Sequence, residues 1–86
     1  MTVYIPSPLR SYTGQRSVVE ADGATLDAAL RELDQCYPGF RFRIISEQDT
    51  IREHINIFVN RAPVQRLDVA LQPGDTIHII CAISGG

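Results

Sequence analysis

Apolar and polar residues alternate along several stretches of the chain, which is the period expected of half-buried β-strands. The first stretch is 2–6, where Val3 and Ile5 are the apolar positions. A turn-rich connection at 7–14 then leads to a second short apolar stretch at 17–21. Together these two stretches predict a hairpin with an enlarged loop.

One helix is predicted between residues 25 and 37. Thr25 stands where an N-cap is expected, and Asp27 places a negative charge in the first turn. Pro38-Gly39 ends the helix. Its apolar positions fall on a single stripe with helical spacing: Leu26, Leu30, Leu33 and Tyr37.

The middle of the chain gives a weaker signal. Phe40, Phe42 and Ile44 alternate with arginines before a polar stretch at 46–49. This pattern predicts an extended segment that leads into a loop. Residues 55–60 alternate much more clearly and predict a strand.

The last third of the chain predicts two turns and a final strand. The turns are at 60–63 and 72–75, with a covering segment at 67–71 between them. The strand at 76–83 is apolar on both faces, as is typical of a strand in the middle of a sheet.

A hairpin, one helix across it and two further strands, in so short a chain, form the β-grasp (ubiquitin-like) arrangement. We therefore expect an α+β fold with a mixed sheet of four to five strands crossed by one main helix. The helix stripe should face four apolar strand positions: Val3, Ile5, Ile57 and Ile79.

Length and charge narrow the possible partners. The 86 residues are enough for one domain, expected at 1–81, followed by a flexible tail at 82–86. The net charge of −2 gives no electrostatic reason to bind nucleic acid or an anionic membrane, so the expected partners are proteins. All eight basic residues are arginine. Without lysine, no side-chain amine can accept an isopeptide bond, so in any conjugate this chain would be the donor.

The cysteines and the chain start suggest a reducing compartment. The start lacks the charged and apolar regions of a signal peptide, and no apolar stretch is long enough to span a membrane. Cys36 and Cys81 form neither a disulfide framework nor a metal-ligand pattern. We therefore expect no bound metal and a cytoplasmic location.

The last five residues carry the strongest functional signal. The apolar strand is followed by Ala82, Ile83 and Ser84, and the sequence ends in Gly85 and Gly86. Glycine has no Cβ, so such a tail can enter the narrow active site of another protein and present the Gly86 carboxylate there. Five extended residues could reach about 17 Å beyond the fold. A frayed, functionless end would have a similar composition.

A second candidate site lies on the sheet. Phe58, His78 and Ile80 are expected on the face opposite Ile57, where they would form one apolar patch that binds a partner. The alternative is that a loop of this chain covers Phe58. In the tail, Ile83 and Ser84 are expected to contact the same partner while Gly85 gives access to Gly86.

The sequence resembles the MoaD/ThiS family of ubiquitin-like sulfur carriers over its whole length. The resemblance lies in the strand at 55–60, the turn at 71–75, the apolar strand that follows and the Gly-Gly end. Within the family, the segments 3–14 and 37–39 look most like the CysO-type carriers of cysteine biosynthesis. Cys81 departs from the pattern, since a proline or a small apolar residue is expected there.

The resemblance implies a mechanism in which this chain is a protein co-substrate rather than an enzyme. A ubiquitin-activating-type adenylyltransferase would adenylate Gly86, using its own ATP and Mg, so the chain itself needs no cofactor. Sulfur would then replace AMP to give a thiocarboxylate. A cysteine-synthase-like enzyme would accept the sulfur, and a JAMM-type metalloprotease could trim the product.

Two other functions agree with the same residues. The chain could be the small subunit of molybdopterin synthase, with its tail held permanently in a larger subunit. It could also be a ubiquitin-like modifier attached to lysines of other proteins. Neighbouring genes for a cysteine synthase and a JAMM-type protease, or for pterin synthesis, would distinguish these functions.

Overall fold

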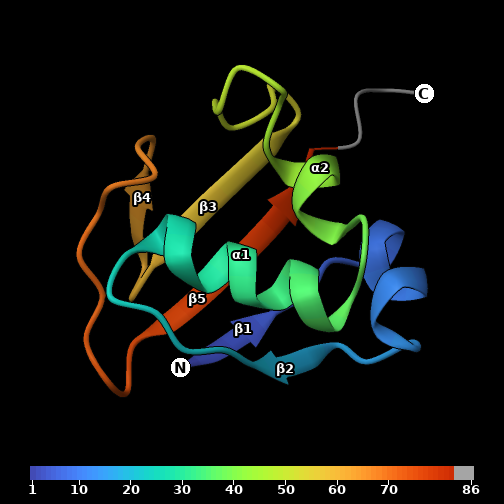
Figure 1. Ribbon diagram of the computed structural model, residues 1–86, viewed down its shortest axis with the longest axis horizontal. Coiled ribbons are helices and arrows are strands. Elements are labelled where there is room, and N and C mark those ends of the chain that lie inside the picture. The colour runs from blue at the N-terminus through green and yellow to red at the C-terminus, as the bar shows by residue number, and fades with distance from the viewer. Residues whose placement is uncertain (83–86) are drawn as a thin grey trace.

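A computed structural model describes residues 1–82, which form a five-stranded mixed sheet with its helices on one side (Figure 1). The strand order across the sheet is β2-β1-β5-β3-β4. This is the expected β-grasp arrangement. The strands are β1 (Thr2–Tyr4), β2 (Val18–Glu20), β3 (Ile55–Val59), β4 (Ala62–Val64) and β5 (Thr76–Cys81).

The last strand, β5, lies in the centre of the sheet, as its two apolar faces predict. It pairs in parallel with β1, where Val3 is opposite Ile77, and antiparallel with β3, where Ile57 is opposite Ile79. These four side chains are buried beneath the helix, as is Ile5 just after β1. The pairing of the first strand with the last strand therefore forms the middle of the core.

The main helix, α1 (Leu26–Cys36), begins and ends where the sequence predicts. The Thr25 hydroxyl accepts a hydrogen bond from the Ala28 amide at 3.2 Å, which satisfies one of the free donors of the first turn. The predicted stripe is confirmed, because Leu26, Leu30 and Leu33 are all buried. Within residues 1–82, no helix is long and apolar enough to cross a bilayer.

The prediction of an extended segment after residue 40 is wrong, because Phe40–Ile44 is a short helix, α2. Gly39 starts it with a φ of 92°, a left-handed conformation that favours glycine. Phe40 and Ile44, one helical turn apart, are buried, whereas Phe42 is 57% exposed. The alternation of apolar residues concealed this helical spacing because Phe42 is an outward-facing aromatic residue.

The turn predicted at 60–63 is shorter than expected and leads into a further strand. Asn60 and Arg61 have φ angles of 49° and 74°, which is typical of a two-residue hairpin turn. The chain then pairs with β3 as the edge strand β4. The turn-rich connection after β1 likewise contains a 3₁₀ helix, η1 (Ser7–Thr13).

The burial of the α1 stripe predicts a large loss of stability when it is truncated. Leu30→Ala should lower the free energy of unfolding by about 2–5 kcal/mol, because a fully buried side chain leaves a cavity. Gln35→Ala, on the exposed side of the same helix, should change it by less than about 0.5 kcal/mol. Urea denaturation followed by circular dichroism measures both. Equal effects of the two substitutions would contradict the assigned helix face.

Candidate functional site

The sheet face opposite α1 carries one row of side chains that crosses all five strands. In the pairing register, each member of this row lies beside the next. Side chains alternate between the two faces of a strand, so these residues point away from the buried positions Val3, Ile57 and Ile77. The row, called the open-face row below, consists of Val18, Tyr4, His78, Phe58 and Pro63.

The centre of the open-face row is aromatic. The rings of Tyr4 and His78 are stacked, with centroids 4.4 Å apart and planes 4° from parallel. Phe58 is the cross-strand neighbour of His78 and is half-buried. Ile80, two residues further along β5, is 46% exposed. The structure thus brings Phe58, His78 and Ile80 onto one face, and their role in binding a partner stays a prediction.

Tyr4 belongs to this surface but was not among the predicted site residues. It is 40% exposed and covers one side of the His78 ring. The signal was present in the sequence, because Tyr4 lies between the two buried residues Val3 and Ile5 and must face the other way. What the sequence did not show is that β1 lies beside β5.

The predicted tail begins where β5 ends. Cys81 is the last residue of the strand, and the Ala82 amide donates a hydrogen bond of 2.7 Å to the His54 carbonyl oxygen. This bond extends the pairing one residue past β5. The other predicted tail residues, Ile83, Ser84, Gly85 and Gly86, lie outside the described residues, so their roles stay predictions.

The two cysteines lie in different environments. Both are free thiols; Cys36 is exposed at the end of α1, whereas Cys81 is partly buried. Burial raises the pKa of the Cys81 thiol, which keeps it protonated and a poor nucleophile. Residues 1–82 contain no cluster of three or more His, Cys, Asp or Glu side chains that could hold a metal ion.

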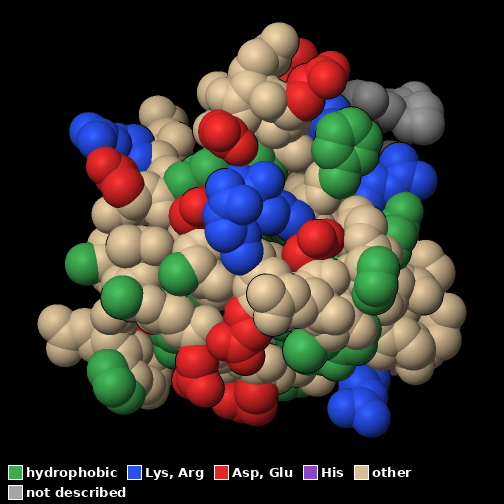
Figure 2. All heavy atoms as spheres, viewed as in Figure 1, with side chains coloured by type: hydrophobic (Ala, Val, Ile, Leu, Met, Phe, Trp, Pro, Cys, Tyr) green, Lys and Arg blue, Asp and Glu red, His purple; other side chains and the backbone are tan. Residues whose placement is uncertain are grey.

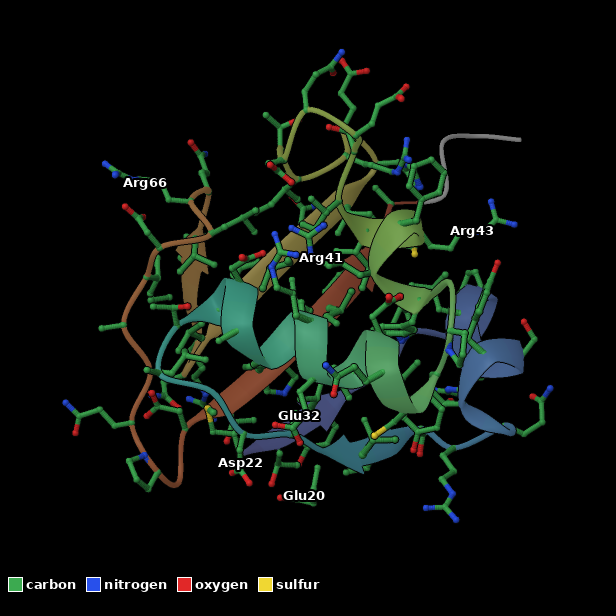
Figure 3. The ribbon with its side chains drawn as sticks, viewed as in Figure 1. Glu20, Asp22, Glu32, Arg41, Arg43 and Arg66 are labelled. Carbon is green, nitrogen blue, oxygen red and sulfur yellow. The ribbon has the colours of Figure 1, made fainter. Side chains whose placement is uncertain are left out.

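An ion-pair cluster on the helix side of the molecule fastens α2 and the loop after it to α1. Arg41 bonds to Asp27 at 2.7 Å and to Asp49 at 3.3 Å (Figure 3). Partial burial would raise the pKa of Asp27, but hydrogen bonds from Arg31 and Arg41 outweigh that effect and hold it below its usual value. Since these charges are paired with one another, we assign this cluster to the fold.

A mixed five-stranded sheet crossed by one main helix is the β-grasp fold of ubiquitin-like proteins. The chain belongs to the ThiS family, whose model matches residues 3–86. This confirms the resemblance seen in the sequence.

Individual relatives match over the full length. The chain is 35% identical to the sulfur carrier protein CysO of Mycobacterium tuberculosis, in an alignment that covers 100% of this chain and 98% of that protein. The structure resembles CysO in the Amycolatopsis orientalis BexX/CysO complex, with a TM-score of 0.92, 34% identity, and 99% and 98% of the two chains covered. It also resembles SAMP1 from Haloferax volcanii, with a TM-score of 0.79, 28% identity, and 100% and 98% covered.

The different exposure of the two thiols predicts different reactivity. Near neutral pH, iodoacetamide should alkylate Cys36 at least about ten times faster than Cys81, because a buried thiol forms little thiolate. Peptide mass spectrometry after timed quenching measures the two rates. In denaturant the rates should converge, and equal rates in the folded protein would contradict this assignment.

Proposed function

We propose that this chain is a sulfur carrier protein that holds sulfur as a thiocarboxylate on Gly86. The observation that carries the proposal is the 35% identity to the sulfur carrier protein CysO over the whole chain. Two features of the chain support it. The sequence ends in Gly-Gly, and the strand before this end also forms the middle of the open-face row.

Loading with sulfur needs an activating enzyme, because a carboxylate is a poor electrophile. In the proposed reaction, an adenylyltransferase joins the Gly86 carboxylate oxygen to the α-phosphate of ATP and releases pyrophosphate. A sulfur nucleophile then forms a C–S bond to the Gly86 carbonyl carbon, and the C–O bond to AMP breaks. The chain contributes the carboxylate, and the enzyme contributes the ATP and Mg sites.

The open-face row is proposed as the surface that docks this enzyme or the sulfur acceptor. Aromatic residues often form the centres of protein interfaces, and Tyr4, His78 and Phe58 lie side by side across β1, β5 and β3. The relative CysO has been solved in complex with BexX, which supports a role for this chain in binding a larger partner. A cysteine-synthase-like acceptor and a JAMM-type protease remain proposals that rest on the family resemblance.

A second candidate function is protein modification. The similarity to SAMP1 from Haloferax volcanii favours it, because SAMP1 is a small archaeal modifier protein. The chemistry would start from the same adenylated glycine, with a lysine amine in place of the sulfur nucleophile. Since this chain has no lysine, it could only be the donor. Lysine conjugates of higher mass in cells would support this candidate.

The thiocarboxylate proposal predicts a defined change of mass. Incubation with the adenylyltransferase that acts on this chain, ATP and sulfide should raise the intact mass by about 16 Da, because one oxygen is replaced by sulfur. Alkylation followed by peptide mass spectrometry should place the label on Gly86. A Cys36→Ser, Cys81→Ser double variant should load as the wild type does.

Two tail variants serve as controls for this experiment. Deletion of Gly86 should abolish the shift, and Gly85→Val should do the same, because a β-branched side chain restricts the backbone and widens the tail. Both variants should keep the wild-type circular dichroism spectrum. Label on a cysteine with an unmodified Gly86 would overturn the proposal.

Truncation of side chains in the open-face row, or of Ile80 beside it, should slow adenylation without unfolding the domain. Phe58→Ala and Ile80→Ala should each lower kcat/KM for adenylation by about tenfold or more, as expected for central interface residues. Gln35→Ala is the control and should leave kcat/KM unchanged, because Gln35 is exposed on α1, on the opposite side of the sheet from the row. Pyrophosphate release measures the rates. If the Phe58 and Ile80 variants also matched the wild type, the row would have no docking role.

A further inference from the structure

A groove of about 700 Å³ lies beside the end of β5, apart from the open-face row. Its walls come from segments far apart in the sequence: η1, α2, the segment before β3, and the end of β5. The side chains that line it include Tyr12, Phe42, Arg43, Arg52 and Cys81. The groove therefore borders the point from which the chain continues to Gly86.

Two arginines in this groove contact aromatic rings. The Arg52 guanidinium lies 4.6 Å from the centre of the Phe42 ring, and its Nε donates a 2.7 Å hydrogen bond to the Phe42 carbonyl oxygen. Arg43 lies over the Tyr12 ring at 5.7 Å, and its Nε donates to the Tyr12 hydroxyl. In both arginines Nε already donates a hydrogen bond within the chain. The terminal nitrogens of the guanidinium are left to bind another acceptor.

These terminal nitrogens have no acidic partner within residues 1–82. No carboxylate lies within ion-pair distance of Arg43 or Arg52 in that part of the chain, as is also true of Arg10, Arg16 and Arg61, whereas Arg31, Arg41 and Arg66 are paired with aspartates. Glu47 also lines the groove. The charged side chains of the groove are therefore two guanidiniums and one carboxylate. The groove is thus locally positive in a chain whose net charge is −2.

Apart from Glu47, which lines the groove, three further carboxylates lie away from it. Glu20, Asp22 and Glu32 gather at the edge of the molecule where α1 faces β2, and Arg43 projects from a different edge, beside α2 and η1 (Figures 2 and 3). A protein that approaches the end of β5 therefore meets arginines before it meets these carboxylates. Such an arrangement favours an acidic partner.

The groove adjoins the proposed docking face. Cys81 and Pro8 line the groove, and both also line a hollow of about 380 Å³ on the open face, together with Tyr4, His78 and Ile80. A partner that covers the open-face row and surrounds the tail must therefore pass over the mouth of the groove.

We infer that the groove between α2 and η1 binds a carboxylate-bearing segment of the adenylyltransferase that receives the tail. This inference rests on the proposed function and adds the chemistry of the partner surface. Planar guanidiniums match carboxylates by paired hydrogen bonds, and the ring contacts hold Arg43 and Arg52 in place before binding. The open-face row supplies apolar contact, and the groove supplies charge selectivity.

The test is charge reversal in the groove. The Arg43→Glu, Arg52→Glu double variant should lower kcat/KM for adenylation by about tenfold or more, mainly through KM, because like charges repel. Arg61→Glu is the matched control: it reverses an exposed arginine in the β3–β4 turn, at the other end of the sheet, and should change kcat/KM by less than about twofold. Thermal unfolding by circular dichroism checks that each variant is folded.

Salt dependence gives a second measurement that does not depend on the stability of a variant. For the wild type, kcat/KM should fall steeply as NaCl rises, because salt screens the charge pairs, and this slope should be smaller for Arg43→Gln, Arg52→Gln. If the wild type is loaded but the double variants equal it in rate and slope, the groove proposal is overturned alone. If the wild type acquires no sulfur, the proposed function fails and the groove proposal fails with it.

Discussion

The position of β5 in the centre of the sheet is the constraint on which the rest of the structure depends. It joins β1 and β2 on one side to β3 and β4 on the other, and among the strands of residues 1–82 no other strand pairs with both sides. Its inward side chains, Ile77 and Ile79, are buried under α1. Because β1 and β5 run parallel, the chain must cross the sheet between them, and α1 lies on that crossing. The proposed reactive end therefore follows the central strand of the sheet rather than an edge strand.

The same strand couples the tail to the docking surface. Residues of β5 alternate between the core and the open face, so His78 and Ile80 have positions fixed by the burial of their neighbours. A partner that binds the proposed docking surface is thereby placed in a defined position relative to Cys81, the last residue of β5. Such positioning raises the effective concentration of the tail at an active site without any catalytic group on this chain.

The sequence predicts those parts of the fold in which periodicity and burial agree. The α1 stripe, the central strand and the outward direction of Phe58 follow from spacing alone, because each is long enough to show its period. Helix α2 has only five residues, and the exposed Phe42 disguised its spacing. Strand β4 has three residues and contains Pro63, which an edge strand tolerates but which argues against a strand in sequence.

The side-chain contacts of the candidate site could not be predicted from the sequence for a different reason. Tyr4 stacks on His78 and Arg43 on Tyr12, and these pairs are separated by dozens of residues along the chain. No local pattern encodes such contacts, since they exist only after β1 and β5 pair and η1 packs beside α2. The sequence marks where the chemistry should occur, and tertiary packing decides which side chains surround it.

The positive charges in the groove beside the end of β5 come from arginine and not from lysine, and the two side chains differ in their chemistry. A guanidinium can stack on a ring, donate from Nε and still present its terminal nitrogens, as Arg43 and Arg52 do. It also stays protonated, so it is no nucleophile toward an adenylated glycine. Arginine thus supplies positive charge beside the end of β5 without supplying an amine acceptor for the proposed adenylated glycine.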